Sequence, residues 1–417
     1  MTNSSQHASA QYRSTQQRTA GTWQAVLLLA GSCLPVLGSV LLTPILPQLS
    51  KVFADTPGSE VLVPLIVAIP ALMIALFAPF AGQIVDRLGR KTLLIVAMFV
   101  YGIVGTAPLY LDTLGAILAS RVGVGIAEAA IMTCCTTLIV DYFHEEKRRN
   151  KYLSLQTVVT TLAATVFFAV GGALGAAGWR TPFWVYASAF VIAIPMIFSL
   201  WQPARADGAD ARAIAAKMPV PWSRLRLPLV VALFGGFSFY VFIIELSYLL
   251  VGVGVTETPL IGLASALASL ATAAGAFTFA RVSRRGPKVL LPIGFGLQAV
   301  GMLLILVAPA FGVVIVAALI AGAGSGLLLP TMLTWALASV TFAERGRSTG
   351  WWQSAFFFGQ FLTPLIMGAL TAAVGGLPAA VGVVGGFCAV VAIALAVGMR
   401  NSAPVQVIDE EVSAPVA

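Results

Sequence analysis

Apolar and polar residues follow one another along this chain in long blocks. Each apolar block is long enough to cross a hydrocarbon core of about 30 Å as a helix. Lipid cannot satisfy free backbone groups, and no alternating barrel pattern occurs, so we expect helices rather than strands. The pattern predicts twelve membrane spans, at residues 23–46, 61–85, 92–110, 114–140, 152–176, 182–200, 228–251, 258–280, 288–308, 311–340, 350–373 and 377–399.

The longest polar interruption, residues 201–227, divides these spans into two sets of six. We therefore predict an all-α membrane protein with twelve transmembrane helices in two pseudo-symmetric six-helix bundles. The expected parts are a cytoplasmic N-terminal tail at 1–22, a first bundle at 23–200, a cytoplasmic central loop at 201–227, a second bundle at 228–399 and a cytoplasmic C-terminal tail at 400–417.

Composition supports a membrane protein and excludes other classes. Of the 417 residues, 59% are hydrophobic and 10% are charged, whereas a soluble domain averages about 25% charged residues. This excludes an ordinary globular enzyme, and disorder would need low hydrophobicity and high charge. The four cysteines lie in apolar runs without disulfide or metal-site spacing, and neither histidine lies in a span. We expect no enzymatic activity, no metal and no cofactor, with a proton gradient as the energy source.

The formal charge of +8 describes topology rather than a nucleic-acid site. Nearly all of the 24 lysines and arginines fall in loops on one side if the amino terminus is cytoplasmic; Lys51 and Arg180 would face outward, and Arg121 lies inside a span. This asymmetry is typical of the positive-inside rule. We expect a multi-pass protein of a bacterial inner membrane with both termini cytoplasmic. Its partners would be a small-molecule substrate, protons and membrane lipid, with no nucleic acid, and we expect a monomer.

The two halves repeat one another. Gly89-Arg90-Lys91 after the second span corresponds to Gly286-Pro287-Lys288 after the eighth, and Phe143, Glu145 and Arg148 correspond to Phe342, Glu344 and Arg347. Such a duplication is typical of transporters in which two bundles enclose a central site that opens alternately to each side.

The loop after the second span carries the most specific motif, Gly82-Gln-Ile-Val-Asp86-Arg87-Leu-Gly89-Arg90-Lys91. It resembles the loop signature of the major facilitator superfamily, and with twelve spans and the duplication the resemblance covers nearly the whole chain. A glycine at 89 permits the tight turn. The resemblance implies that Asp86 latches this loop to the eleventh span near Gly350; a solvated basic loop would explain the cations alone. The expected gating residues are Gly82, Asp86, Arg87, Gly89, Arg90, Lys91 and Asp141.

The fourth span contains two ionisable residues, Arg121 and Glu128, around Gly125. An arginine inside the membrane is costly enough to be a functional candidate. Arg121 and Gly125 resemble the superfamily's signature for this helix, and the resemblance associates the arginine with proton coupling in antiporters. The alternative is an arginine held by backbone carbonyls as a packing device.

The seventh span contains a third candidate for proton coupling, Glu245. Counting about 1.5 Å per residue places Glu245 at a depth similar to that of Arg121. The resemblance implies that spans 1, 4, 7 and 10 line the central cavity. We therefore expect Arg121 and Glu245 to meet across the two bundles in one state; burial disfavours the carboxylate and an adjacent arginine favours it, so their separation would load or release a proton. The alternative is a glutamate exposed near the outer mouth.

Other polar or aromatic residues in the spans are candidates for substrate contacts, although each could instead be an interhelical contact. They are Ser39, Thr43, Gln156, Tyr240, Thr331, Trp335, Gln353 and Gln360.

These observations predict a secondary active transporter that exports small amphipathic or aromatic organic molecules in exchange for protons. Direction remains open, because the fifth span lacks the glycine-proline signature typical of drug:proton antiporters. One alternative is proton-coupled uptake of an organic anion bound by Arg121. Another is a non-transporting membrane receptor on the same scaffold.

Overall fold

Helices and their connections make up the part of the chain that the structure, a computed structural model, describes: residues 20–203, 220–308, 310–338, 340–341 and 344–399. Twelve helical segments are long and apolar enough to cross a membrane, and no strand occurs among these residues. The predicted fold class is confirmed. Most of the expected tails and of the central loop lie outside the described residues.

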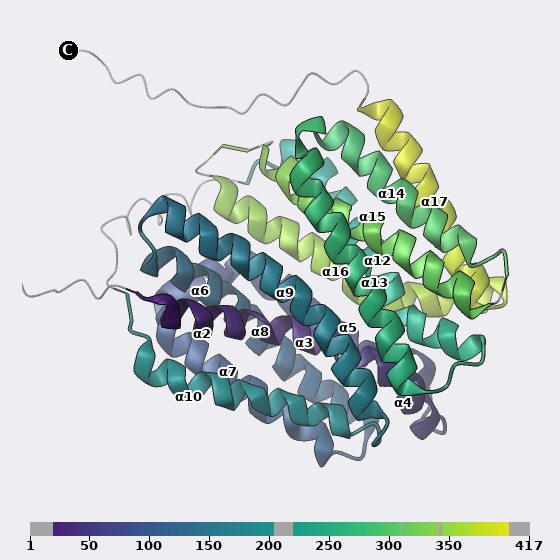
Figure 1. Cartoon of the computed structure of the whole chain (residues 1–417), viewed down its shortest axis with the longest axis horizontal. Coiled ribbons are helices and arrows are strands. Elements are labelled where there is room, and N and C mark those ends of the chain that lie inside the picture. Colours follow the sequence, from purple (N-terminus) through teal and green to yellow (C-terminus); the bar gives the residue numbers. More distant parts are fainter. Residues whose placement is uncertain (1–19, 204–219, 309, 339, 342–343, 400–417) are drawn as a thin grey trace, which may run out of the picture.

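The first half forms six spans with short connections, seen in purple to teal in Figure 1. Several spans consist of more than one helical piece. The pieces are α2 (Thr22–Ser32), α3 (Leu34–Val40), η1 (Thr43–Ile45), α4 (Leu46–Val52), α5 (Ser59–Phe77), η2 (Ala78–Phe80), α6 (Ala81–Leu88), α7 (Arg90–Thr106), η3 (Ala107–Leu109), α8 (Leu114–Tyr142), α9 (Glu146–Gly175), η4 (Thr181–Ala187) and α10 (Ser188–Ser199).

The second half repeats this arrangement with fewer breaks. Its first helix begins at Trp222 rather than at the predicted residue 228. The pieces are α12 (Trp222–Gly252), α13 (Thr258–Val282), η5 (Ser283–Arg285), α14 (Pro287–Leu304), α15 (Phe311–Ala338), α16 (Arg345–Val374) and α17 (Leu377–Gly398).

Each half has its own hydrophobic core. One cluster of buried side chains runs from Ala20 to Leu200, and a second runs from Val231 to Met399. Among the described residues, only Tyr240 and Ile244 of the second half belong to the first core. Both lie on α12, so this helix contributes buried side chains of the second half to the core of the first.

The first span is broken. Prolines stand at the beginning of α3, η1 and α4, namely Pro35, Pro44 and Pro47. Proline has no backbone N–H and its ring clashes with the preceding turn, so it begins a helix well and interrupts one that is already running. The breaks leave backbone carbonyls of this span available to side chains from other helices.

The two halves approach each other closely along α9 and α13. A Cβ at Gly172 would lie 2.7 Å from the Cα of Gly262, so these backbones are in direct contact. Small residues allow such approach between membrane helices. Thr165 donates a hydrogen bond of 3.1 Å to Ser269 on the same pair of helices. On the other side of the molecule, Gly350 of α16 packs against Ala78 and Pro79 of η2.

The start of the first span and the end of the sixth lie together at one end of the molecule. Trp23 Nε1 donates to Ser199 Oγ at 3.0 Å, and Lys91 Nζ donates to the carbonyl oxygen of Ile197 at 2.7 Å. Gly89 has φ of 84° and Gly286 has φ of 74°, so both halves turn at this end through a glycine in the left-handed region. We call it the basic end, after Arg87, Arg90, Lys91, Lys147, Arg148, Arg149, Lys151, Arg284, Arg285, Lys288, Arg345 and Arg347.

Candidate functional site

Arg121 of α8 is fully buried and is held by the end of a neighbouring helix. Its Nη2 donates to the carbonyl oxygens of Val104, at 3.2 Å, and Gly105, at 3.1 Å, in the last turn of α7. Carbonyls in this turn lack intrahelical partners, and a cation there is favoured by the helix dipole. The guanidinium carbon also lies 5.4 Å from the ring centre of Phe183 and 4.9 Å from that of Tyr186. Nη1 has no hydrogen-bond partner among the described residues.

Glu128, also on α8, is fully buried, and neither carboxyl oxygen has a hydrogen-bond partner in the described part of the chain. Its Oε1 occupies the space beside Gly38 of α3, where any Cβ would overlap it. Arg121 is near enough for their charges to interact. A buried carboxyl group without partners costs stability, so its presence points to a function.

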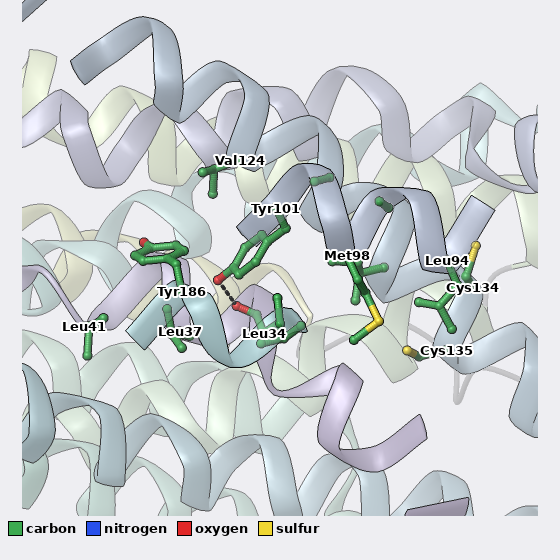
Figure 2. Close-up of a cluster of buried hydrophobic side chains, with 14 of the residues drawn as sticks. Leu34, Leu37, Leu41, Leu94, Met98, Tyr101, Val124, Cys134, Cys135 and Tyr186 are labelled. Carbon is green, nitrogen blue, oxygen red and sulfur yellow. Dashed lines mark hydrogen bonds between the residues drawn. The ribbon is translucent and has the colours of Figure 1, made fainter. Parts of the chain in front are cut away.

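Three buried tyrosines lie in the neighbourhood of this carboxyl group. Tyr101 of α7 donates to the carbonyl oxygen of Leu34 at 2.7 Å (Figure 2). Its ring centre lies 5.2 Å from that of Tyr186, whose hydroxyl has no hydrogen-bond partner among the described residues. Tyr240 of α12 completes the group, and all three are near enough to Glu128 to interact electrostatically. We call the set the tyrosine–glutamate cluster: Tyr101, Arg121, Glu128, Tyr186 and Tyr240.

Glu245 lies apart from this cluster. It is 6% exposed and forms no hydrogen bond within the described residues; its electrostatic neighbour is Tyr248, whose hydroxyl lies 3.0 Å from Ser50 Oγ of the first half. The expected meeting of Arg121 and Glu245 does not occur in this conformation. Arg121 turns toward α7 and η4 instead, because depth in the membrane says nothing about direction around the helix axis. The sequence also allowed an arginine held by backbone carbonyls, and the Nη2 of Arg121 is held in this way.

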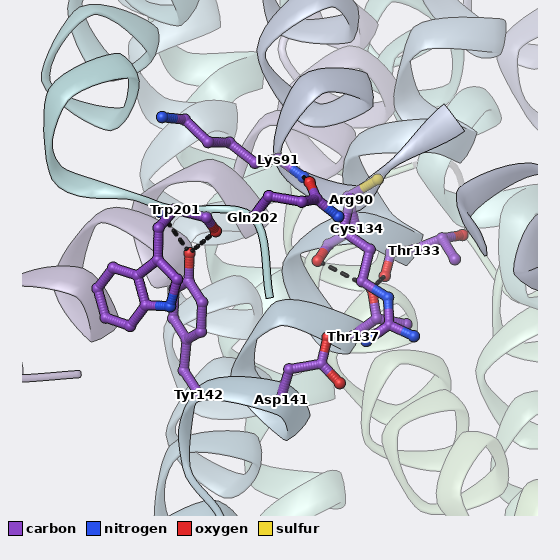
Figure 3. A network of polar contacts seen from close by, with 9 residues as sticks. All are labelled: Arg90, Lys91, Thr133, Cys134, Thr137, Asp141, Tyr142, Trp201 and Gln202. Atoms are coloured by element: carbon purple, nitrogen blue, oxygen red, sulfur yellow. Dashed lines mark hydrogen bonds and ion pairs between the residues drawn. The ribbon is translucent and has the colours of Figure 1, made fainter. Parts of the chain in front are cut away.

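The predicted gating residues gather at the basic end. Arg90 forms an ion pair with Asp141, joining the beginning of α7 to the end of α8 (Figure 3). Lys91 binds α10 and the residues after it: its Nζ donates to the carbonyl oxygen of Ile197 at 2.7 Å, and its backbone N–H donates to Gln202 Oε1 at 3.1 Å. A cavity of about 210 Å³ is lined by Gly82, Val85, Arg90, Thr136, Thr137, Val140 and Asp141.

The two remaining charged residues among the predicted gating residues are Asp86 and Arg87. Arg87 is exposed, and the side chain of Asp86 lies outside the described part of the structure. The latch between Asp86 and the eleventh span stays a prediction. The end of the second span does contact the start of the eleventh, through Gly350 and Pro79.

Comparison with known proteins identifies the family. The family model described as Major Facilitator Superfamily matches residues 28–256 and 229–415, which together span nearly the whole chain. The chain belongs to the major facilitator superfamily. It is therefore a multi-pass membrane transporter and not an enzyme.

Curated relatives of this superfamily member include a multidrug resistance protein and an exporter. Multidrug resistance protein 2 of Bacillus subtilis (strain 168) is 26% identical over 176 residues, covering 42% of this chain and 43% of the relative. The bacillibactin exporter of the same organism is 27% identical over 153 residues, covering 35% and 37%. The chain thus matches less than half the length of these relatives.

Solved structures show the same fold over a larger part of the transporter. A bacterial homolog of the human lysosomal transporter Spinster, in an inward-facing and unoccupied conformation, matches with a TM-score of 0.69 and 17% identity, covering 90% of this chain and 94% of that one. A D-xylose-proton symporter matches with a TM-score of 0.71 and 14% identity, covering 90% and 97%.

The predicted substrate-binding residues of the transporter are dispersed. The hydroxyl of Thr43 in η1 donates to the carbonyl oxygen of Val40 at the end of α3, at 3.0 Å, and that of Thr331 donates to Leu327 of its own helix, α15, at 2.6 Å. Gln156 bridges three helices, with its Nε2 2.8 Å from Ser32 Oγ and 3.1 Å from Thr136 Oγ1. Ser39 and Tyr240 are brought together, Trp335 and Gln360 are buried, and Gln353 is partly exposed.

Sequence reasoning missed Tyr101 and Tyr186 of the cluster, and it missed a buried network in the second half. Gln298 Oε1 accepts a hydrogen bond of 2.9 Å from Ser238, and its Nε2 donates to Ser325 Oγ at 2.8 Å. We call Ser238, Gln298 and Ser325 the glutamine network. A single amide in the apolar run of α14 was a usable signal for it, whereas a tyrosine in an apolar helix resembles a packing residue.

Proposed function

We propose that this transporter is a proton-coupled exporter of small amphipathic or aromatic organic molecules. The observation that carries the proposal is Glu128, a fully buried carboxyl group without a hydrogen-bond partner among the described residues, beside the buried cation of Arg121. Protonation would remove the charge that burial disfavours. The similarity to a multidrug resistance protein and to a bacillibactin exporter of Bacillus subtilis favours export.

The orientation follows from charge. The basic end would face the cytoplasm, because cytoplasmic loops carry the excess of lysine and arginine. Both termini would then be cytoplasmic in a bacterial inner membrane. Alternating access would proceed by movement of the two halves, and the ion pair of Arg90 with Asp141 would belong to the cytoplasmic gate.

Glu128 is the preferred proton carrier in this proposal. It lies in a cluster with four other polar side chains, one of which comes from the second half. Glu245 is the second candidate, since it is also buried and without a hydrogen bond in the described part of the chain. Arg121 would tune the protonation of Glu128 rather than hold the substrate, because its Nη2 is already bound to two carbonyls.

The proposal is tested by reconstituting the purified protein into liposomes with the basic end outward and acidifying the lumen. A panel of fluorescent aromatic cations, with ethidium as the first probe, reports transport. An exporter that exchanges substrate for protons should accumulate dye against its gradient, and a protonophore should abolish the accumulation. Uptake by symport would instead require an acidic exterior, and a receptor would bind dye without accumulation or counterflow; either result would overturn the proposal.

A further inference from the structure

Tyr240 joins the two halves at the place where Glu128 is buried. It stands on α12, but its hydroxyl donates to the carbonyl oxygen of Val67 on α5 at 2.9 Å and approaches that of Ser39 on α3 at 3.4 Å. The residue is 1% exposed and belongs to the hydrophobic core of the first half. Its hydroxyl is thus a contact between halves made inside the protein.

Glu128 and Tyr240 meet the broken first span at consecutive residues. The carboxyl group of Glu128 lies against Gly38, and the hydroxyl of Tyr240 lies against the carbonyl of Ser39. The absence of a side chain at Gly38 leaves the room that the carboxyl group fills. Two polar groups from different halves therefore approach the same short stretch of α3.

The charged and titratable groups near enough to Glu128 to interact with its charge come from four elements. They are Arg121 on its own helix, Tyr101 on α7, Tyr186 on η4 and Tyr240 on α12, while α3 contributes backbone at Gly38. Within the described part of the chain, Tyr240 is the only one of these that belongs to the second half. A change of charge at Glu128 therefore acts directly on a side chain of the second half, that of Tyr240.

We propose that Tyr240 is a positioning residue that couples the charge of Glu128 to the relative position of the two halves. A phenol has one proton to donate, so it can serve the carbonyl of Val67 or a carboxylate at Glu128, but not both. With Glu128 neutral, the hydroxyl bonds to the backbone of α5 and α3, as in this structure. When Glu128 becomes a carboxylate, the stronger charge-assisted bond draws the hydroxyl to it and releases the backbone contact.

The inference rests on the proposed proton coupling at Glu128, so the experiment must separate the two. The distance between the halves is measured by double electron–electron resonance between two spin labels. The labels are attached at Tyr110→Cys in the first half and Val307→Cys in the second, which are both highly exposed positions. The background replaces the four native cysteines with alanine, and each protein is checked for monodispersity. Distances are measured in liposomes on either side of neutral pH.

The test variant is Tyr240→Phe, which keeps the ring and removes the hydroxyl. The population ratio of the two distance states should respond to pH in the parent protein, and in the variant that response should shrink by about tenfold, equivalent to about 1.4 kcal/mol. The matched control is Tyr248→Phe, which loses a hydroxyl that contacts the other half away from Glu128. It should retain the amplitude of the response.

A second measurement distinguishes lost coupling to Glu128 from a change in local packing caused by Tyr240→Phe. Glu128→Gln should fix the distance at all pH values, and adding Tyr240→Phe to it should change little, so the two substitutions should be strongly non-additive. Additive effects, or a pH response in Tyr240→Phe equal to that of the parent, would overturn the coupling role alone. A parent protein whose distance ignores pH would overturn the proton coupling itself, and the role of Tyr240 with it.

Discussion

The two halves of this transporter bury polar groups in opposite ways. In the second half, the glutamine network is satisfied: the amide of Gln298 is bonded to Ser238 and Ser325 at both its oxygen and its nitrogen. In the first half, the tyrosine–glutamate cluster leaves one nitrogen of Arg121, both carboxyl oxygens of Glu128 and the hydroxyl of Tyr186 without hydrogen-bond partners among the described residues. Both groups are closed off from solvent.

The difference indicates a division of labour between the halves. A fully bonded buried network stabilises one arrangement of helices, whereas an unpartnered buried polar group costs about 1–3 kcal/mol and persists only where something else requires it. A proton carrier must remain able to gain and lose charge, so it cannot be permanently bonded. The comparison predicts that substitutions in the first cluster alter transport more than stability, and that substitutions in the second do the reverse.

Glu128→Gln should have the largest effect. It removes the titratable group while keeping size and burial, so proton-driven dye accumulation should fall to background. The thermal midpoint of the purified protein should stay level or rise, because a glutamine at this buried position can never carry a charge. Glu245→Gln is the matched control. If Glu245→Gln abolished accumulation and Glu128→Gln did not, the proton would be carried on α12 and the cluster would lose its assigned role.

Arg121→Lys should have the next largest effect. A lysine keeps the charge but loses the hydrogen bond from Nε to Ser120 Oγ and the guanidinium plane beside the rings of Phe183 and Tyr186, and it loses its proton readily when buried. Loss of one hydrogen bond to a charged group predicts a fall in transport rate of about tenfold or more. Initial rates of dye accumulation measure it, and Arg121→Ala should be inactive. Full activity of the alanine variant would reduce Arg121 to a packing device.

Sequence alone gave the spans but not their full lengths. Hydropathy finds a span because the hydrocarbon core has a fixed thickness. Three helices extend further into polar sequence than predicted, beginning at Glu146, Trp222 and Arg345. A helix does not need apolar side chains outside the hydrocarbon region. The apolar sequence pattern therefore ends at the membrane boundary, while the helix extends beyond it.

For the candidate site, sequence found the charges and missed their surroundings. Arg121 and Glu128 are conspicuous because ionisable residues inside a span are rare. The direction of Arg121 depends on packing that sequence does not show: Gly105 leaves the space against α7 that the ring of Tyr186 fills, and a Cβ there would collide with that ring. Tyr240 was selected as a substrate contact, yet its hydroxyl bonds to backbone of the other half.

Gln298→Leu tests the second half of the comparison. It should leave the hydroxyls of Ser238 and Ser325 without their amide partner and lower the free energy of unfolding by about 1–3 kcal/mol. Thermal unfolding in detergent measures the loss, and the rate of dye accumulation at low temperature should stay within about twofold of the parent, as a change of roughly 0.4 kcal/mol or less implies. Replacing all three residues by Ala, Leu and Ala should restore much of the stability, because no buried group is then unpaired. Loss of transport in a stable Gln298→Leu protein would contradict the division of labour.

The smallest effects come from a matched pair of hydroxyl deletions. Ser325→Ala removes a hydroxyl that accepts from Gln298 and donates to the carbonyl oxygen of Ala321 at 2.9 Å, so it should cost about 1 kcal/mol of stability. Tyr186→Phe removes a hydroxyl without a hydrogen-bond partner in the described residues and keeps the ring beneath Arg121, so it should cost nothing or stabilise slightly. Thermal midpoints measured side by side decide the order. If Tyr186→Phe were the more destabilising of the two, its hydroxyl would be bonded in the membrane, and the first cluster would be as well satisfied as the second.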